Sequence, residues 1–289
     1  MEDWILFAFG SAIFAALTSI FAKIGIKDVN SNLATALRTI VVLIMAWIVV
    51  LIVGSEDEIG SISSKTLIFL VLSGLATGAS WLCYFRAVQI GNVNKVAPID
   101  KSSTILTMIL AFIFLGEDFT FWAGIGMIVM FTGTMLMIEK KDVDETKQTK
   151  DSWLIWAIGS AVFAALTSIL GKVGIEGVES NLGTAIRTCV VLVMAWLIVF
   201  MQGTQHQIKD ISPRSNGFLI LSGLATGASW LCFYKALQDG PASLVAPIDK
   251  LSILFTVLFA VIFLHEKMSK KSWVGLALLV IGTLMLLIK

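Results

Sequence analysis

Long apolar runs separated by short polar segments dominate the chain. Each run is about 20 residues long, and a helix that rises about 1.5 Å per residue spans a hydrocarbon core of about 30 Å over that length. The pattern predicts an all-α integral membrane protein of ten transmembrane helices. We place these helices at roughly 4–22, 34–53, 66–88, 97–115, 120–138, 153–171, 183–202, 216–238, 246–264 and 272–288.

The second half of the chain repeats the first at a shift of 149 residues. The segments Phe14–Ile20, Leu72–Cys83 and Val96–Lys101 recur unchanged at residues 163–169, 221–232 and 245–250. Identities of this length indicate a tandem duplication, and the long polar stretch of the chain lies between the two copies. We therefore expect a first five-helix repeat over residues 1–138, a polar linker over 139–152 and a second five-helix repeat over 153–289.

The odd number of helices in each repeat fixes their relative orientation. After five crossings the chain is on the far side of the membrane, so the second repeat starts from the opposite face. The sequence therefore predicts inverted-topology repeats, related by a pseudo-two-fold axis in the membrane plane.

The positive charges of the loops predict how the protein sits in the membrane. Most Lys and Arg residues outside the apolar runs belong to the face that carries the linker, with four in the linker alone. Cytoplasmic loops carry an excess of Lys and Arg. This rule places the linker in the cytoplasm and both termini outside, for a multi-pass protein of the cell membrane.

Composition excludes several other classes of protein. The chain is 57% hydrophobic and 14% charged, whereas a soluble domain has about 25% charged residues, so the apolar excess must face lipid. A formal net charge of +1 argues against nucleic-acid binding. The three cysteines lie in apolar runs, and no catalytic, phosphate-binding or metal-binding motif is present. We expect no enzymatic activity, no metal and no cofactor.

The fourth and fifth runs of each half share a signature. Val96–Glu117 reads VAPIDKSSTILTMILAFIFLGE and Val245–Glu266 reads VAPIDKLSILFTVLFAVIFLHE. The runs that follow carry Gly124, Gly126 and Gly133 in the first half, and Gly275 and Gly282 in the second. In these motifs the chain resembles the drug/metabolite transporter superfamily, in its ten-helix EamA branch. It departs from the usual pattern in its Asp-Lys pairs, where the family has uncharged residues, and in His265, where the family has Gly.

The resemblance implies a secondary transporter that works by alternating access around a cavity near the bilayer midplane. Helices one, three and four of each half would line this cavity, and the fifth helices would pack peripherally. The expected function is export of an amino acid or a related small metabolite, driven by an ion or proton gradient. Family members usually have both termini in the cytoplasm, which is opposite to the orientation that the loop charges predict.

Hydroxyl and aromatic side chains on the third helix of each half are candidates for substrate binding. They recur at helical spacing, as a mostly apolar pocket with a few orienting polar groups requires. These candidates are Thr77, Ser80, Trp81, Tyr84, Thr226, Ser229, Trp230 and Tyr234. Glycine pairs at four-residue spacing on the same helices, such as Gly74 and Gly78, instead indicate close helix packing. The two interpretations concern different faces of the helix.

Charged side chains inside apolar runs are the remaining candidates, because they are costly in a membrane. The Asp-Lys pairs follow a proline that suits a helix start, where Asp complements the helix dipole. Alternatively, the two pairs form alternating gates near opposite faces, with a carboxylate that takes up a coupling proton. Coupling or gating candidates are Asp100, Lys101, Asp249, Lys250, Glu117 and Glu266. For the two glutamates, which end the fourth helices at a turn, we favour a structural role in turn geometry or gating. Secondary candidates are Lys23, Arg38, Lys172 and Arg187. Snorkelling to the headgroups explains the two arginines equally well, and the two lysines close the first helix of each half, where a cation complements the helix dipole.

Two rival functions follow from the same residues. The excess of cations in and near the helices suits a transporter or exchanger of anionic or phosphorylated metabolites. A non-transporting membrane scaffold or sensor is the rival from another class, although a scaffold has no reason to carry Asp-Lys pairs in its helices. The expected partners are a small-molecule substrate, a coupling proton and the lipid bilayer, and no oligomeric state follows from the sequence.

Overall fold

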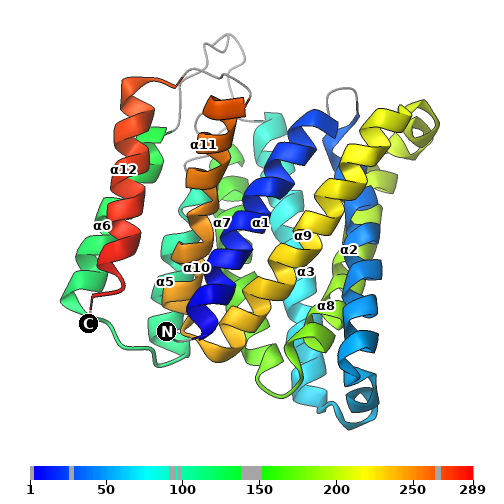
Figure 1. The fold of residues 1–289 in the computed structure, drawn as a ribbon, viewed down its shortest axis with the longest axis horizontal. Coiled ribbons are helices and arrows are strands. Elements are labelled where there is room, and N and C mark those ends of the chain that lie inside the picture. The colour runs from blue at the N-terminus through cyan, green and yellow to red at the C-terminus, as the bar shows by residue number, and fades with distance from the viewer. Residues whose placement is uncertain are drawn as a thin grey trace.

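The computed structural model describes residues 3–25, 29–90, 96, 99–137, 152–263 and 268–288. Within these residues the protein is helical and has no strand, which confirms the all-α prediction (Figure 1). The helices are α1 (Asp3–Gly25), α2 (Ser31–Val53), α3 (Ser64–Ile90), α5 (Ser103–Phe114), α6 (Phe121–Met137), α7 (Ser152–Ile175), α8 (Ser180–Gln202), α9 (Pro213–Asp239), α10 (Ala242–Lys250), α11 (Ser252–Phe263) and α12 (Lys270–Met285). Two short 3₁₀ helices, η1 (Ser55–Ser61) and η2 (Thr204–Asp210), follow α2 and α8.

The polar segments between the apolar runs cap the helices. The Asn30 side chain accepts the backbone N–H groups of Asn32 and Leu33 at the start of α2, and Glu179 caps α8 in the same way. Gly54 and Gly203 end α2 and α8 with φ of 75° and 67°, a left-handed conformation that glycine adopts without strain. The same local chemistry therefore bounds the second helix of both halves.

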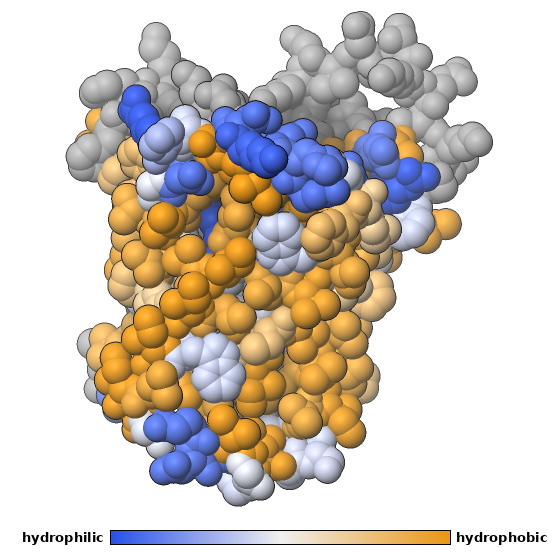
Figure 2. All heavy atoms as spheres, turned by 90° about the vertical axis from the view of Figure 1, so that its right-hand side faces the viewer, coloured by the Kyte–Doolittle hydropathy of each residue, from blue (hydrophilic) through white to orange (hydrophobic). Residues whose placement is uncertain are grey.

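The protein is a multi-pass membrane protein. Seven of the described helical segments are long and apolar enough to cross a membrane, and Phe121–Met137 is a shorter apolar helix. Large apolar side chains point outward, with Ile52 78% exposed and Ile155 74% exposed. On the face seen in Figure 2, an apolar band crosses the middle of the molecule, and hydrophilic residues gather at both ends. A bilayer covers such a band.

One helix start differs from the sequence-based expectation. Pro247 lies inside α10, which begins at Ala242, and Asp249 and Lys250 are the last residues of that helix. The prediction that this Asp-Lys pair lies in a first helical turn is therefore wrong. Leu251 is a turn residue between α10 and α11, and the two helices together form one apolar span over Ala242–Ile262.

The helices of the two halves pack in reciprocal pairs. α1 packs along α9, and its repeat equivalent α7 packs along α3. α2 packs on α8 at one edge of the bundle, and α6 packs on α12 at the other (Figure 1). Each of these contacts therefore joins an element of one half to an element of the other.

Glycines bring α6 and α12 into direct backbone contact. A Cβ atom on Gly133 would lie 2.5 Å from the Leu279 amide nitrogen, and one on Gly282 would lie 2.6 Å from the Met130 amide nitrogen. Small residues are typical of such close helix crossings in membranes. The glycines of the fifth runs therefore join the two peripheral helices.

Two names describe the ends of the bundle below. The η1 end carries η1, the start of α1 and the end of α12, and it is the lower end in Figure 1. The η2 end is the opposite one, where α6 ends and α7 begins (Figure 1).

Candidate substrate-binding cavity

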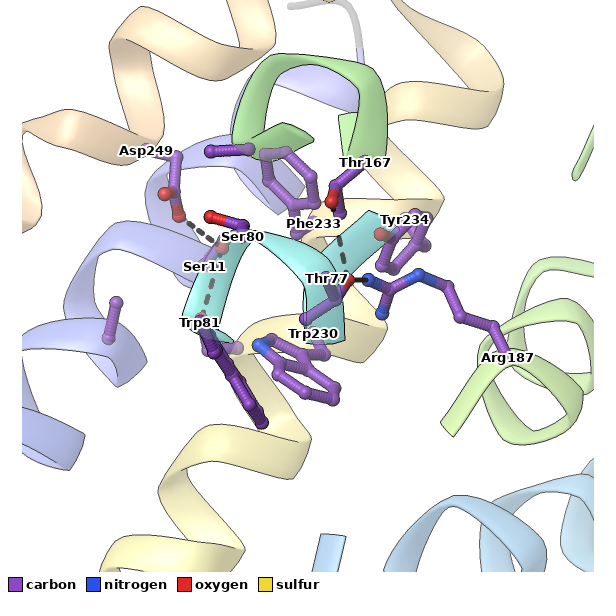
Figure 3. Close-up of a pocket in the computed structure, with 13 residues that line it drawn as sticks. Ser11, Thr77, Ser80, Trp81, Thr167, Arg187, Trp230, Phe233, Tyr234 and Asp249 are labelled. Atoms are coloured by element: carbon purple, nitrogen blue, oxygen red, sulfur yellow. Dashed lines mark hydrogen bonds between the residues drawn. The ribbon is translucent and has the colours of Figure 1, made fainter. Parts of the chain in front are cut away.

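A cavity of about 300 Å³ lies between helices of both halves. Its walls come from α1, α3, α7, α8, α9 and α10. The lining residues are Ser11, Ala15, Thr77, Ser80, Trp81, Ala164, Thr167, Arg187, Ser229, Trp230, Phe233, Tyr234 and Asp249 (Figure 3). Aromatic rings and hydroxyl groups dominate this lining, and two charged side chains interrupt it.

The structure brings six of the eight third-helix candidates to this cavity. Thr77, Ser80, Trp81, Ser229, Trp230 and Tyr234 line it. Tyr84 packs instead with Val96 and Ala157 beside the cavity. Thr226 donates to the Ser222 carbonyl at 2.7 Å and to the Thr18 hydroxyl at 3.2 Å. The cavity also includes Phe233, the repeat equivalent of Tyr84.

The glycine pairs of α3 and α9 face away from the cavity, as helix packing requires. A Cβ on Gly74 would lie 2.7 Å from the Val190 Cβ atom of α8, and one on Gly223 would lie 2.7 Å from the Val41 Cβ atom of α2. One face of each third helix therefore packs against a second helix, and another face lines the cavity.

Arg187 is buried at one side of the cavity, with 2% of its surface exposed. Its Nε donates to the Ser73 hydroxyl at 2.9 Å and its Nη2 donates to the Thr77 hydroxyl at 2.6 Å. The guanidinium lies 4.6 Å from the Tyr234 ring centroid and 5.3 Å from that of Trp230. Burial of this depth excludes snorkelling to the headgroups, which was the alternative explanation for this residue.

No described carboxylate forms an ion pair with Arg187. The ion pair between described residues joins Lys235 to Asp239, at 3.0 Å. Burying a charge without a partner is costly, even where hydrogen bonds satisfy part of it. The cavity therefore contains a cation that neutral hydroxyls and aromatic rings hold in place.

Asp249 lies across the cavity from Arg187 (Figure 3). Its Oδ1 accepts a hydrogen bond from the Ser11 hydroxyl at 2.6 Å, and the Ser11 and Ser229 hydroxyls are 3.2 Å apart. The indole rings of Trp81 and Trp230 lie together on a third side (Figure 3). The cavity thus combines a cationic side, an anionic side and an aromatic wall.

The first-half equivalents of these charges lie outside the cavity lining. Asp100 accepts a hydrogen bond from the Ser160 hydroxyl at 2.7 Å. Arg38 donates from Nη1 to the Ser222 hydroxyl at 3.0 Å, while its buried Nε has no hydrogen-bond partner among the described residues. Lys23, in the last turn of α1, is exposed.

Lys101 and Lys250 line one small second cavity, together with Thr104 and Met130. The expectation that the two Asp-Lys pairs lie near opposite faces is therefore wrong for the lysines. The segments that carry them pack on each other, because α5 contacts α10. In the described part of the chain, neither Asp100 nor Asp249 forms an ion pair.

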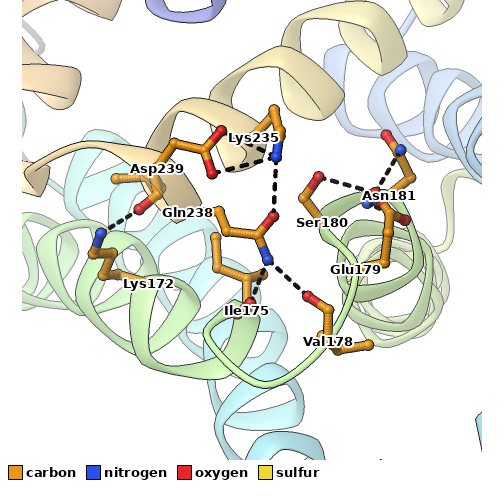
Figure 4. A network of polar contacts seen from close by, with 10 residues as sticks. Lys172, Ile175, Val178, Glu179, Ser180, Asn181, Lys235, Gln238 and Asp239 are labelled. Carbon is orange, nitrogen blue, oxygen red and sulfur yellow. Dashed lines mark hydrogen bonds and ion pairs between the residues drawn. The ribbon is translucent and has the colours of Figure 1, made fainter. Parts of the chain in front are cut away.

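Polar side chains tie the loops together at the η1 end. The Glu117 carboxylate accepts the backbone N–H groups of Ala242 and Ser243, at 2.6 and 2.8 Å, and so caps α10. The Lys172 ammonium donates to the Leu237 and Gly240 carbonyls at the end of α9 (Figure 4). These two side chains hold the short connection between α9 and α10 from both sides.

Gln238 adds a third link at the η1 end. Its Nε2 donates to the Ile175 and Val178 carbonyls of the α7–α8 connection, at 2.7 and 2.8 Å (Figure 4). At the η2 end its repeat equivalent Gln89 accepts from Arg86, as Gln238 accepts from Lys235. Arg86 and Gln89 line a cavity of about 820 Å³. Glu266 and His265, the residues equivalent to Glu117 and Gly116, lie outside the described residues.

Comparisons with known proteins agree with this architecture. The model of the EamA-like transporter family matches the chain twice, over residues 3–139 and 151–288. The uncharacterized transporter in the cobO 3' region of Sinorhizobium sp is 47% identical over 135 residues, which cover 47% of this chain and 96% of that protein. Human solute carrier family 35 member G1 is 27% identical over 265 residues, which cover 89% of this chain and 71% of that protein.

A solved crystal structure shares the fold along nearly the whole length. It aligns with a TM-score of 0.78 at 15% identity, and the alignment covers 99% of this chain and 97% of that one. The putative ribose uptake protein RbsU of Lactobacillus johnsonii is 22% identical, over 91% of this chain and 90% of that protein. Because the family model accounts for both halves, the chain belongs to the EamA-like transporter family.

Proposed function

We propose that this protein is a secondary transporter that exports a small zwitterionic metabolite, of the amino-acid class, across the cell membrane. The observation that carries this proposal is the position of Arg187, a buried cation without a described carboxylate partner that faces the same cavity as Asp249. A ligand with a carboxylate and an ammonium group would pair with both side chains, the carboxylate with Arg187 and the ammonium group with Asp249. The planar guanidinium is well suited to a carboxylate, which it can bind through two hydrogen bonds.

The rest of the cavity suits the remainder of such a molecule. Trp81, Trp230 and Phe233 supply apolar surface, and an apolar pocket with a few fixed polar groups is typical of small-ligand sites. Ser11 and Ser229 add hydroxyls near Asp249, and Ser80 adds a further hydroxyl to the lining. A small apolar side chain against the indole rings would leave the ligand's charged groups free to reach Arg187 and Asp249.

We propose further that the helices form ten spans in two inverted repeats, over residues 1–138 and 153–289. The reciprocal packing of α1 on α9 and of α7 on α3 supports this arrangement. So does the Sinorhizobium relative, because 135 residues cover 96% of its length and it is therefore about as long as one repeat. By the loop charges, the η2 end and the linker face the cytoplasm and both termini lie outside.

Transport would proceed by alternating access to the central cavity. The contacts of Glu117, Lys172 and Gln238 support a conformation closed at the η1 end. The cavity at Arg86 and Gln89 supports access from the η2 end. Asp249, and Asp100 in the equivalent position, are the carboxylates that we assign to proton coupling. Asp249→Asn should then abolish gradient-driven accumulation and retain exchange.

A transporter of anionic or phosphorylated metabolites is the second candidate. The lack of a described carboxylate at Arg187 favours it, whereas Asp249 in the same cavity disfavours an anion with no positive group. The relative named for ribose uptake extends the comparison to a neutral sugar, which would leave both charged side chains without an oppositely charged partner.

Binding of matched ligands to the purified protein tests the proposal. We expect L-leucine to bind and to be transported in proteoliposomes. Leucinamide lacks the carboxylate and 4-methylpentanoate lacks the ammonium group, and each should bind at least about tenfold more weakly, since a lost charged hydrogen bond costs about 1.5–3 kcal/mol.

Substitutions of Asp249 and Arg187 test separately which ligand group each side chain binds. Asp249→Asn should remove the preference for L-leucine over 4-methylpentanoate, and Arg187→Gln should remove the preference over leucinamide. Asp118→Asn, in an exposed loop, is the matched control and should bind like the wild type. Tighter binding of glycerol 3-phosphate than of L-leucine would replace the zwitterion with the anionic alternative.

A further inference from the structure

We propose that Arg38 and Asp100, which do not line the central cavity in this conformation, bind the ligand when the protein opens at the η1 end. Arg187 and Asp249 form the second-half dyad, which faces the cavity here, and Arg38 and Asp100 form the first-half dyad. The inference rests on the proposed function, because it concerns the ligand of the same cavity. It assigns two further substrate-binding residues and a conformation in which each dyad acts.

The two dyads occupy equivalent positions in the repeats. The shift of 149 residues that relates the halves takes Arg38 to Arg187 and Asp100 to Asp249. It also takes their serine neighbours Ser73 and Ser11 to Ser222 and Ser160.

Equivalent hydroxyls hold the two arginines. Arg187 donates to Ser73, and Ser73 donates in turn to the Thr167 carbonyl. Arg38 donates to Ser222, and Ser222 donates to the Thr18 carbonyl. Each arginine is thereby linked through the third helix of the opposite half to the first helix of its own half.

Equivalent hydroxyls also hold the two aspartates. The Ser11 hydroxyl lies 2.6 Å from the Asp249 Oδ1 atom, and the Ser160 hydroxyl lies 2.7 Å from that of Asp100. Ser11 and Ser160 each come from a first helix that packs along the third helix of the other half. Both dyads are therefore built on the same framework.

The dyads differ in how completely the arginine is satisfied. Arg187 also donates to Thr77 and lies over two aromatic rings. The Arg38 Nε is buried and has no described partner. Thr77 and its equivalent Thr226 both contact a threonine hydroxyl of a first helix, but among the described contacts Arg38 donates to Ser222 and not to Thr226. A buried donor without a partner costs free energy, so Arg38 has an interaction left to gain in another conformation.

Inverted repeats explain what that conformation is. In such proteins one repeat rocks against the other around a fixed site, and we take the opposite access state to be the one in which the two halves have exchanged their conformations. Arg38 and Asp100 would then adopt the places that Arg187 and Asp249 hold here, and the η1 end would open. The ligand would thus contact the second-half dyad in one access state and the first-half dyad in the other.

A ligand shifts a conformational equilibrium only by its difference in affinity for the two states. Removing one dyad should therefore make the ligand favour the state that uses the other. The experiment uses cysteine reporters in a chain whose Cys83, Cys189 and Cys232 are replaced by alanine. Val178→Cys, at a position 6% exposed in the closed η1 end, reports opening there. Its repeat equivalent Val29→Cys reports the η2 end.

L-leucine is the probe, and the rate of alkylation is the measurement. With Arg38→Gln we expect L-leucine to slow labelling at Val178→Cys and to accelerate it at Val29→Cys. Each rate should change by at least about threefold, because a tenfold loss of affinity in one access state shifts the equilibrium between the two states by up to tenfold. Arg187→Gln should reverse both changes. Asp100→Asn and Asp249→Asn should repeat the two patterns without a change of side-chain size.

The outcomes separate the two levels of the proposal. L-leucine could change the labelling rates in the same direction in Arg38→Gln and Arg187→Gln, or as in the wild type in both Arg38→Gln and Asp100→Asn. Either result would overturn the role of the first-half dyad and leave the proposed zwitterion site intact. A wild type that binds none of L-leucine, L-serine or L-phenylalanine removes the proposed function, and the dyads with it. Arg38→Lys, which keeps the charge, should restore most of the wild-type response.

Discussion

The carboxylate of Glu117 accepts the backbone N–H of Ala242 at 2.6 Å, so a residue of the first half caps a helix of the second. The cap fixes the start of α10, the helix that carries Asp249 at its other end. Position at a helix N-terminus also suits the negative charge. A structural role for Glu117 agrees with this contact, which lies at the end of the bundle that we propose to be closed.

Glu117→Ala should weaken the closed η1 end. Loss of a helix cap costs about 1 kcal/mol, so we expect a lower melting temperature and faster alkylation of Val178→Cys. Glu117→Gln keeps one acceptor oxygen and should fall between the wild type and the alanine variant. Unchanged labelling in Glu117→Ala would show that the cap does not hold this end closed.

The packing of α1 on α9 and of α7 on α3 predicts two disulfides. A Cβ on residue 10 would lie 4.0 Å from the Cys232 Cβ atom, and one on residue 159 would lie 3.8 Å from the Cys83 Cβ atom. Both distances are within the range of about 3.5–4.5 Å for disulfides. Gly10→Cys and Gly159→Cys should each form a bond between the halves under mild oxidation.

A protease site in the 139–152 linker makes these crosslinks visible. After cleavage, the two halves should migrate together on a denaturing gel without reductant and apart with it. Cys232→Ser in the Gly10→Cys chain and Cys83→Ser in the Gly159→Cys chain are the matched controls. Halves that separate in both oxidised variants would contradict the helix packing.

Trp81 and Trp230 should matter more for binding than for folding. Both are partly exposed and line the cavity, so truncation removes ligand contact area and little buried core. We expect Trp81→Ala and Trp230→Ala to weaken L-leucine binding by about tenfold or more, the loss of roughly 1.5 kcal/mol of apolar contact, with a small change in melting temperature. A large loss of stability with unchanged affinity would make them packing residues.

The orientation in the membrane is open to a direct test. Single cysteines in the 139–152 linker should be protected from an impermeant reagent in intact cells, whereas a cysteine at Asp57 of η1 should react. The loop charges give this expectation. Reaction at the linker and protection at Asp57 would reverse the orientation, to the one that is usual in the family.

The sequence predicted the cavity face of the third helices but not where the cavity ends. Thr77, Ser80 and Trp81 lie within about one helical turn and all line the cavity. Tyr84 lies on the same face as Thr77, but seven residues carry it about 10 Å along the axis, where Val96 and Ala157 fill the space. Periodicity gives the direction of a side chain, whereas its depth depends on neighbours from distant parts of the chain.

The charged residues show the same limit more strongly. Arg187 lies near the start of an apolar run, where burial and snorkelling are equally compatible with the sequence. Ser73 and Thr77, more than 100 residues away along the chain, hold it inside. Lys101 and Lys250 lie together because α5 and α10 touch, and no local pattern reports that contact.

The aromatic residues around the cavity differ between the halves in one respect. The first half has Tyr84-Phe85 where the second has Phe233-Tyr234, so a phenol lies against Arg187 and a phenyl group occupies the equivalent position in the other repeat. Two identical subunits would necessarily give two access states related by a two-fold rotation equal energies. A fused duplicate is free of that constraint. If the proposed alternating access holds, the exchange of neighbouring aromatic residues is one difference that would give the two access states of the empty protein unequal energies.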